Sequence, residues 1–154
     1  MLKTLPTLAA TLTLIGNAAL AETACTVGGF DVTDKINGFP PPAQATGLKD
    51  TVIMMDRLLP SGERIVVARG TRPAGTRAPI HVHKYGGHTC VLSGAITDFV
   101  EGLAPSLFPA DSCYYMPANT PMTAANLGSE DAVLIDTFIL PPGEDTITVI
   151  EFCP

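Results

Sequence analysis

The chain has 154 residues, of which 46% are hydrophobic, and its 9 Lys and Arg against 15 Asp and Glu give a formal net charge of −6. This acidic balance argues against a nucleic-acid partner, because binding to phosphate backbones needs clustered Lys and Arg. The length fits one domain that can bury its own hydrophobic core.

Residues 1–21 have the order of a secretory signal peptide. Lys3 gives a basic start, residues 5–20 are mostly apolar, and Ala19 and Ala21 fit the small-residue pattern of a cleavage site. The apolar stretch contains polar residues and is short for crossing about 30 Å of hydrocarbon. We therefore expect a periplasmic or secreted protein with no membrane span after processing.

Residues 22–47 predict an irregular leader, because Gly28, Gly29 and the run Pro40-Pro41-Pro42 cannot continue a regular helix. Residues 48–154 carry short apolar or alternating runs separated by turns rich in Gly and Pro. No long stretch keeps a 3.6-residue period, so the sequence predicts one all-β domain over residues 48–154. The expected strands are 51–58, 64–68, 80–83, 89–92, 95–100, 112–116, 122–125, 132–140 and 146–152.

The segment 75–94, GTRAPIHVHKYGGHTCVLSG, holds the clearest chemical pattern of the chain. His81 and His83 are two residues apart in an expected strand, and alternate side chains of a strand point to the same face. Such a pair can bind one ion. Neutral imidazole suits copper, zinc, iron, manganese and nickel alike, so the pair does not identify the metal. The alternative is a pair that is hydrogen-bonded to its neighbours and binds no metal.

The spacing of this segment resembles the first motif of the cupin superfamily, in which a Gly, an H-x-H pair, a Glu and a second Gly follow one another. Gly75, Gly94 and the histidine pair match that motif. The Glu position falls on Gly87 or His88, depending on the end from which one counts. The family carboxylate is therefore missing.

A degenerate copy of the second cupin motif follows at 111–126, DSCYYMPANTPMTAAN. It keeps Pro117 and Asn126, whereas Met122 stands where the family has its ligand His. The two motifs together imply a cupin-type jelly-roll β-barrel with a metal-binding pocket. Two of the four family ligands, His81 and His83, are present.

Two residues could complete a metal shell around this pair. His88 would add a third imidazole if Gly86 and Gly87 form a bulge that turns the next side chain inward, and it faces solvent otherwise. Met122 would add a thioether, which suits copper(I), or else fills the barrel interior.

The three tyrosines of the chain, Tyr85, Tyr114 and Tyr115, all lie beside the two motifs. Tyr114 and Tyr115 are adjacent in an expected strand, so one of them should face the pocket and the other should not. A phenol in the pocket could donate to a substrate oxygen, or cap a buried polar group.

All four cysteines follow the signal peptide, in a compartment where disulfides persist. Four cysteines allow three pairings. Cys25 and Cys153 lie at the two ends of the mature chain, and these positions favour a disulfide between them. Cys90 and Cys113 lie in the two motif regions, which the cupin resemblance places on neighbouring antiparallel strands, so a bridge between them is geometrically allowed. Thiol ligands for a metal are disfavoured, because no C-x-x-C spacing occurs.

Two functions fit these features. The first is an exported metal-dependent enzyme of the dioxygenase or oxidase, lyase or isomerase type, which acts on a small oxygen-bearing molecule. The second is a non-catalytic cupin that binds a small ligand or copper and has lost its active site. A cupin fold accommodates both, so the sequence leaves open whether the protein is an enzyme. A homodimer is an expectation by analogy with other cupin barrels.

Overall fold

A computed structural model describes residues 25–153 of the chain, so the expected signal peptide at 1–21 lies outside the described residues. Every regular element in the described range is a β-strand. This confirms the all-β prediction. No helix of the described range is long and apolar enough to cross a membrane.

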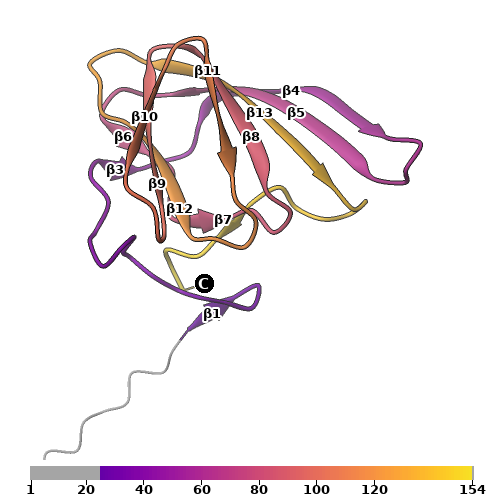
Figure 1. The fold of residues 1–154 in the computed structure, drawn as a ribbon, viewed down its shortest axis with the longest axis horizontal. Coiled ribbons are helices and arrows are strands. Elements are labelled where there is room, and N and C mark those ends of the chain that lie inside the picture. Colours follow the sequence, from indigo (N-terminus) through magenta and orange to yellow (C-terminus); the bar gives the residue numbers. More distant parts are fainter. Residues whose placement is uncertain (1–24, 154) are drawn as a thin grey trace, which may run out of the picture.

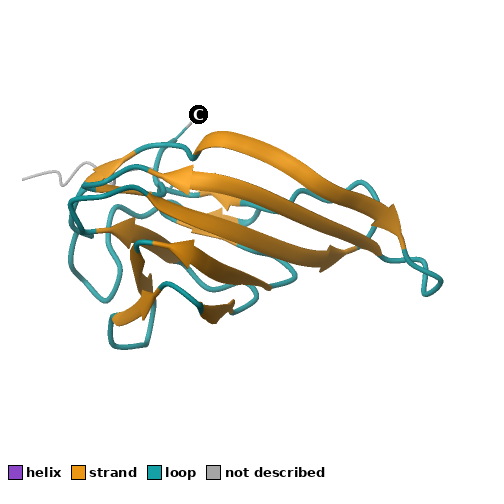
Figure 2. Ribbon diagram, turned by 90° about the horizontal axis from the view of Figure 1, so that it is seen from above, coloured by secondary structure: helices purple, strands orange, loops and turns teal. Residues whose placement is uncertain are grey.

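Two larger sheets lie face to face and enclose the core (Figures 1 and 2). The first sheet has five strands in the order β11-β8-β13-β5-β4. These strands are β4 (Lys49–Leu58), β5 (Arg64–Arg72), β8 (Gly87–Ser93), β11 (Ser112–Met116) and β13 (Ala132–Leu140).

The second sheet has seven strands, of which five run in the order β10-β9-β12-β6-β3, while β7 pairs with both β12 and β14. A separate two-stranded sheet in the leader joins β1 (Thr26–Val27) to β2 (Phe30–Asp31). The strands of the second sheet are β3 (Gln44–Ala45), β6 (Thr76–Arg77), β7 (His81–Val82), β9 (Ala95–Val100), β10 (Ser106–Pro109), β12 (Met122–Asn126) and β14 (Thr148–Val149).

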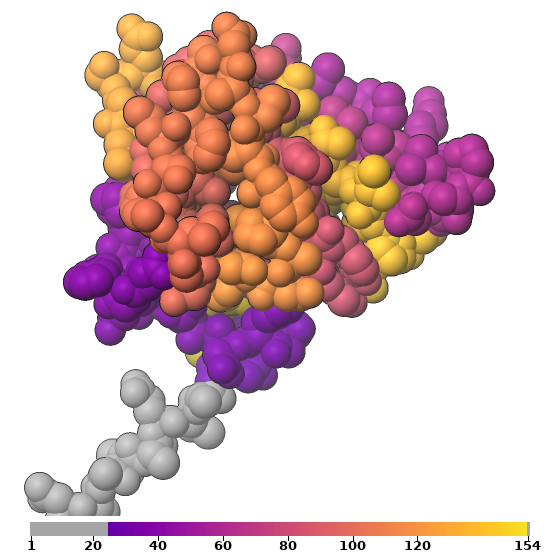
Figure 3. Space-filling view, viewed as in Figure 1, coloured from indigo at the N-terminus to yellow at the C-terminus, as the bar shows by residue number. Residues whose placement is uncertain are grey.

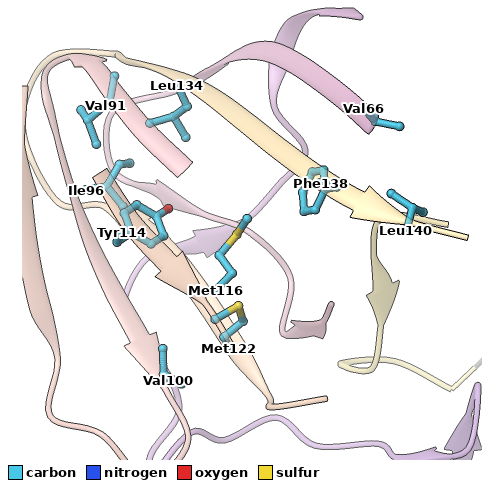
Figure 4. Packing of buried hydrophobic residues seen from close by; sticks show 11 residues of the cluster. Val66, Val91, Ile96, Val100, Tyr114, Met116, Met122, Leu134, Phe138 and Leu140 are labelled. Atoms are coloured by element: carbon cyan, nitrogen blue, oxygen red, sulfur yellow. The ribbon is translucent and has the colours of Figure 1, made fainter. Parts of the chain in front are cut away.

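Strand alternation builds the core between the two sheets. Along β13, Leu134, Phe138 and Leu140 are buried and point inward, because successive side chains of a strand alternate between its faces. Figure 4 shows these side chains together with the other labelled residues of the apolar cluster. The main apolar cluster consists of Val66, Val91, Ile96, Val100, Tyr114, Met116, Met122, Ala132, Leu134, Phe138 and Leu140.

The β4–β5 hairpin extends beyond the barrel (Figure 1), and all ten residues of its edge strand β4 are exposed. In Figure 3 it lies beside the C-terminal segment drawn in yellow. Arg64 Nη1 donates a 3.4 Å hydrogen bond to the backbone oxygen of Glu144, which links hairpin and segment. These two parts border the mouth of a cavity between the sheets.

Two disulfides close the fold, in the pairing that the sequence suggested. Cys25 is bonded to Cys153, 128 positions away, and so ties the ends of the described chain together. Cys90 and Cys113 stand directly opposite each other on β8 and β11, with their Cα atoms 4.0 Å apart. Within the described residues no cysteine is free, so thiol ligation of a metal has no support there.

Candidate metal and ligand site

Strand β7 carries the histidine pair into the barrel. His81 lies opposite Met122 of β12 on one side and Val149 of β14 on the other, and His83 follows β7 with a bridge to Ala118. The two imidazoles point to the same face, as the H-x-H spacing predicts. Both are buried, with 5% and 4% of their surface exposed.

Each imidazole is held by a backbone carbonyl. The Nδ1 atom of His81 is 2.7 Å from the oxygen of Pro79, and the Nδ1 atom of His83 is 2.6 Å from the oxygen of Thr146. Carbonyl oxygens only accept hydrogen bonds, so each Nδ1 must carry the proton and donate it. The remaining ring atoms, the two Nε2, face each other at 3.1 Å.

This arrangement leaves two lone pairs pointing at one another. Burial lowers the pKa of His81 to about 3, assisted by repulsion from His83, and burial also lowers the pKa of His83. Both rings are therefore neutral near pH 7, and with both Nδ1 protonated neither Nε2 has a proton to share. A cation between the two nitrogens would satisfy both of them.

The separation of the two nitrogens suits such an ion. Two imidazole nitrogens that each lie about 2.0–2.1 Å from one zinc ion are roughly 3 Å apart when they occupy adjacent coordination positions. The donor set of His81 and His83 thus fits a transition metal. Among the residues that the structure describes, no group of three or more His, Cys, Asp and Glu side chains could hold a metal, so the pair stands alone.

His88 does not join the pair. Strands β8 and β11 pair in unbroken register from Gly87 opposite Met116 and His88 opposite Tyr115 onward, with no bulge at Gly87 or His88. Alternation therefore turns His88 outward, where its exposed ring packs against Tyr115 at 5.2 Å between centroids. The bulge that would bring this imidazole inward is absent from β8.

An aromatic ring lies beside Gly87, one of the two positions to which the cupin resemblance assigns the missing carboxylate. A Cβ atom placed on Gly87 would lie 2.6 Å from Cδ1 of Phe138 and 2.9 Å from Cε of Met116. The Phe138 ring also packs against His83, with centroids 5.0 Å apart. The packing of Phe138 therefore allows only glycine at position 87, because any side chain there would collide with the ring.

Met122 lies beside the pair in register but belongs to the core. It stands opposite His81 in the β12–β7 pairing, and directly opposite residues in antiparallel strands share a face. Its side chain is 1% exposed and packs in the main apolar cluster, pointing toward Met116 in Figure 4. It is not among the residues that line the cavity.

The tyrosines divide as the alternation predicts. Tyr114 is 6% exposed and lines the cavity, whereas Tyr115 is 56% exposed on the outer face. Tyr85 is also at the surface, where Lys84 Nζ lies 5.3 Å from the centre of its ring. Only Tyr114 of the three can therefore reach a molecule inside the barrel.

The histidines open into a cavity of about 540 Å³. Its walls are mostly apolar, with Leu48, Val66, Leu134 and Phe138 among the lining residues. Such a volume and lining are typical of sites for small organic ligands. The polar side chains deep in the cavity, besides the histidine pair, are Arg72, Thr89, Tyr114 and Asp136.

Asp136 supplies a carboxyl group that our sequence analysis missed. Thr89 Oγ1 donates a 2.6 Å hydrogen bond to its Oδ1 atom. Burial raises the pKa of Asp136, an effect opposed by that hydrogen bond and by the charge of Arg72. A signal was present in the sequence, because Asp136 occupies an inward position between Leu134 and Phe138 in an otherwise apolar alternation.

Comparison with known proteins identifies the fold. No protein-family model and no curated protein matches the sequence. A conserved protein with a double-stranded β-helix domain from Klebsiella pneumoniae matches the structure with a TM-score of 0.54 at 17% identity, over 72% of this chain and 91% of that one. An RmlC-like cupin family protein from Methanocaldococcus jannaschii gives a TM-score of 0.50 at 18% identity, over 70% and 92%.

DMSP lyase DddQ from Ruegeria pomeroyi gives a TM-score of 0.49 at 16% identity over 55% of this chain, and the match spans 42% of that protein. Identities this low bear on the fold alone. The chain has the double-stranded β-helix fold that these proteins share, which is the cupin-type barrel that its two motifs predicted.

Proposed function

We propose that this protein holds one transition-metal ion between His81 and His83 and binds a small oxygen-bearing molecule in the adjacent cavity. One observation carries the proposal: two buried Nε2 atoms face each other at 3.1 Å while both Nδ1 atoms are committed to backbone carbonyls. Hydrogen-bonding partners alone leave this pair unsatisfied, whereas a cation satisfies it.

The backbone carbonyls prepare the pair for this role. Donation from Nδ1 to Pro79 and to Thr146 fixes the tautomer of each ring and holds its Nε2 lone pair toward the cavity. When bound, the ion would act as a Lewis acid toward an oxygen of the ligand. Because the protein contributes two ligands, several coordination positions stay available to that molecule and to water.

Proton transfer would fall to the opposite wall. Asp136 lines the same cavity, and its raised pKa brings the carboxyl group closer to the range in which it exchanges a proton near neutral pH. Thr89 orients this carboxyl group through the 2.6 Å hydrogen bond. Burial and the nearby acids raise the pKa of Tyr114 strongly, so its phenol stays protonated and can donate a hydrogen bond but does not act as a phenolate base. These groups favour an enzyme over a pure carrier.

The alternative function, a non-catalytic cupin that binds a small ligand or copper, rests on a different observation. Phe138 occupies the space beside Gly87 that a family carboxylate would need. A barrel that had lost its chemistry would show this kind of apolar filling. The presence of Asp136 in the cavity is the feature that argues against it.

The test is calorimetric titration of metal-free protein with zinc, copper and manganese salts. We expect His83→Ala to weaken binding of the preferred ion by at least about a hundredfold, because one of two imidazole ligands is lost. His88→Ala is the matched control, since it removes an imidazole from the outer face and should bind as the wild type does. Equal affinities for wild type and His83→Ala would refute the metal site.

A further inference from the structure

Arg72 is a buried cation on the cavity wall that the proposed metal site does not use. It is 4% exposed, ends strand β5 and lines the cavity. Two contacts fix its position: its Nη1 donates a 2.6 Å hydrogen bond to the oxygen of Thr46, and its own backbone oxygen accepts a 3.1 Å bond from Asn126 Nδ2. The guanidinium is therefore held rigidly against the cavity.

No carboxylate of the described residues neutralises this charge. Another buried arginine of the barrel, Arg77, shows the contrast: it forms bidentate hydrogen bonds of 2.7 and 2.6 Å with Glu151. Arg72 takes part in none of the ion pairs among residues 25–153. Its Nε is buried without a partner, as is the Nε of Arg77, but its Nη2, unlike that of Arg77, donates no hydrogen bond within that range.

The acid that shares the cavity with Arg72 is hydrogen-bonded to another residue. Asp136 lines the same cavity, and its charge and that of Arg72 affect each other. Yet the short hydrogen bond of Asp136 is to Thr89, and its burial favours the protonated, neutral form. A buried guanidinium without a counter-charge is costly, because the protein interior solvates a charge less well than water does. An anion inside the cavity would remove that cost.

We infer that Arg72 anchors the carboxylate of the cavity's ligand, so that the oxygen-bearing molecule of the proposed function is a small organic acid. This inference rests on the proposed ligand site. Arginine binds carboxylates through charge-assisted hydrogen bonds, and Nη2 is the group with a free donor. The volume of about 540 Å³ and the apolar residues Leu48, Val66 and Leu134 suit a short hydrocarbon or oxygenated body attached to that acid group.

The anchor and the metal pair belong to one cavity. Arg72 and His81 are both among its lining residues. An acid held at Arg72 would therefore extend a second oxygen toward the histidine pair. The cavity would select ligands that have a carboxylate at one end and a metal-binding oxygen a few atoms away.

Ligand-observed NMR of metal-free protein tests the anchor apart from the metal. The probes are acetate, butyrate and 2-oxobutyrate, each compared with its neutral primary amide. We expect wild type to bind at least one acid about tenfold more tightly than its amide, and Arg72→Gln to lose this preference. Arg72→Lys, which keeps the charge but not the planar fork, should retain part of it. Arg57→Gln, on the exposed strand β4, is the control and should behave as wild type.

Two results would overturn the anchor. One is equal binding of acids and amides by wild type, a measurement that needs no variant to fold. The other is a folded Arg72→Gln protein, verified by circular dichroism, that still prefers acids. The zinc titration of His83→Ala reports on the metal pair alone, so the failure of either proposal is visible without the other.

Discussion

The two walls of the cavity differ in how their polar groups are satisfied. On the β7 wall, each imidazole of His81 and His83 has one fixed backbone partner and one lone pair left over. On the wall formed by β5, β8 and β13, Arg72 has donors left over, while Thr89 and Asp136 bond each other. The first wall lacks a cation and the second lacks an anion. The two walls would therefore complement opposite ends of the metal-bound acid that we propose as the ligand.

A buried acid in the sheet that carries the β7 wall gives the largest expected effect. Asp98 of β9 is 6% exposed, and burial raises its pKa to about 7, opposed by a hydrogen bond from the Phe99 backbone. Its native pKa lies above the unfolded value, so the native state holds the proton more tightly. Its contribution to stability is therefore complete below the unfolded pKa of 3.8 and is lost as the pH rises toward 7.

We expect Asp98→Asn to remove this dependence. Relative to wild type, the free energy of unfolding of the variant should rise by about 4 kcal/mol between pH 4 and pH 8, because one pKa unit corresponds to about 1.4 kcal/mol. Urea unfolding of both proteins at pH 4, 6 and 8 measures this difference in the free energy of unfolding. Asp34→Asn, at an exposed position, should show no such change. A constant difference between Asp98→Asn and wild type would mean that Asp98 is ionised throughout.

Phe138 contacts both Gly87 and His83, and so joins the two walls. A substitution at Gly87 should have the next largest effect on stability. We expect Gly87→Ala to destabilise the protein by about 1–3 kcal/mol, because the new Cβ would overlap the ring. In a Phe138→Ala background the same substitution should cost much less, because only the flexible end of Met116 then crowds the new Cβ, and this non-additivity is measured by a double-mutant cycle in urea. Gly47→Ala, where nothing lies within 4 Å of the added Cβ, is the control. Additive effects would show that Phe138 does not block this position.

Much of the fold could be predicted from the chain because local pattern and tertiary environment agree. The strands 95–100, 112–116 and 132–140 begin and end in the structure where their alternation and flanking turns indicate. The histidine pair faces the interior for the same reason. Strand β10 and the short strands of the leader were not predicted, because so few residues carry no clear period.

The rest of the site depends on pairing between distant strands. Gly86 and Gly87 permit either a bulge or a straight strand, and only the register with β11 decides that His88 faces outward. Arg72 and Asp136 each interrupt an apolar alternation, which is a signal, but the chain alone does not show that both line one cavity. The absence of a counter-charge beside Arg72 can be recognised only when the positions of all neighbouring side chains are known.

The last prediction asks whether Met122 takes part in the metal site or only in the core. It lies opposite His81 in register, yet it packs in the apolar cluster outside the cavity lining. Met122→Leu should therefore leave zinc and copper(I) affinity unchanged and cost less than about 1.5 kcal/mol of stability, as volume-conserving core substitutions do. Met122→His should cost roughly 1–3 kcal/mol, because it buries a polar ring.

The same Met122→His substitution should strengthen zinc binding about tenfold, since a third imidazole would stand beside His81 on the shared inner face. Parallel titrations of wild type and both variants with zinc and copper(I) separate the two roles. A loss of copper(I) affinity in Met122→Leu would make the thioether a ligand and extend the β7 wall to three donors. Unchanged zinc affinity in a folded Met122→His protein would mean that position 122 points away from the ion. The β7 wall would then be limited to the pair of histidines.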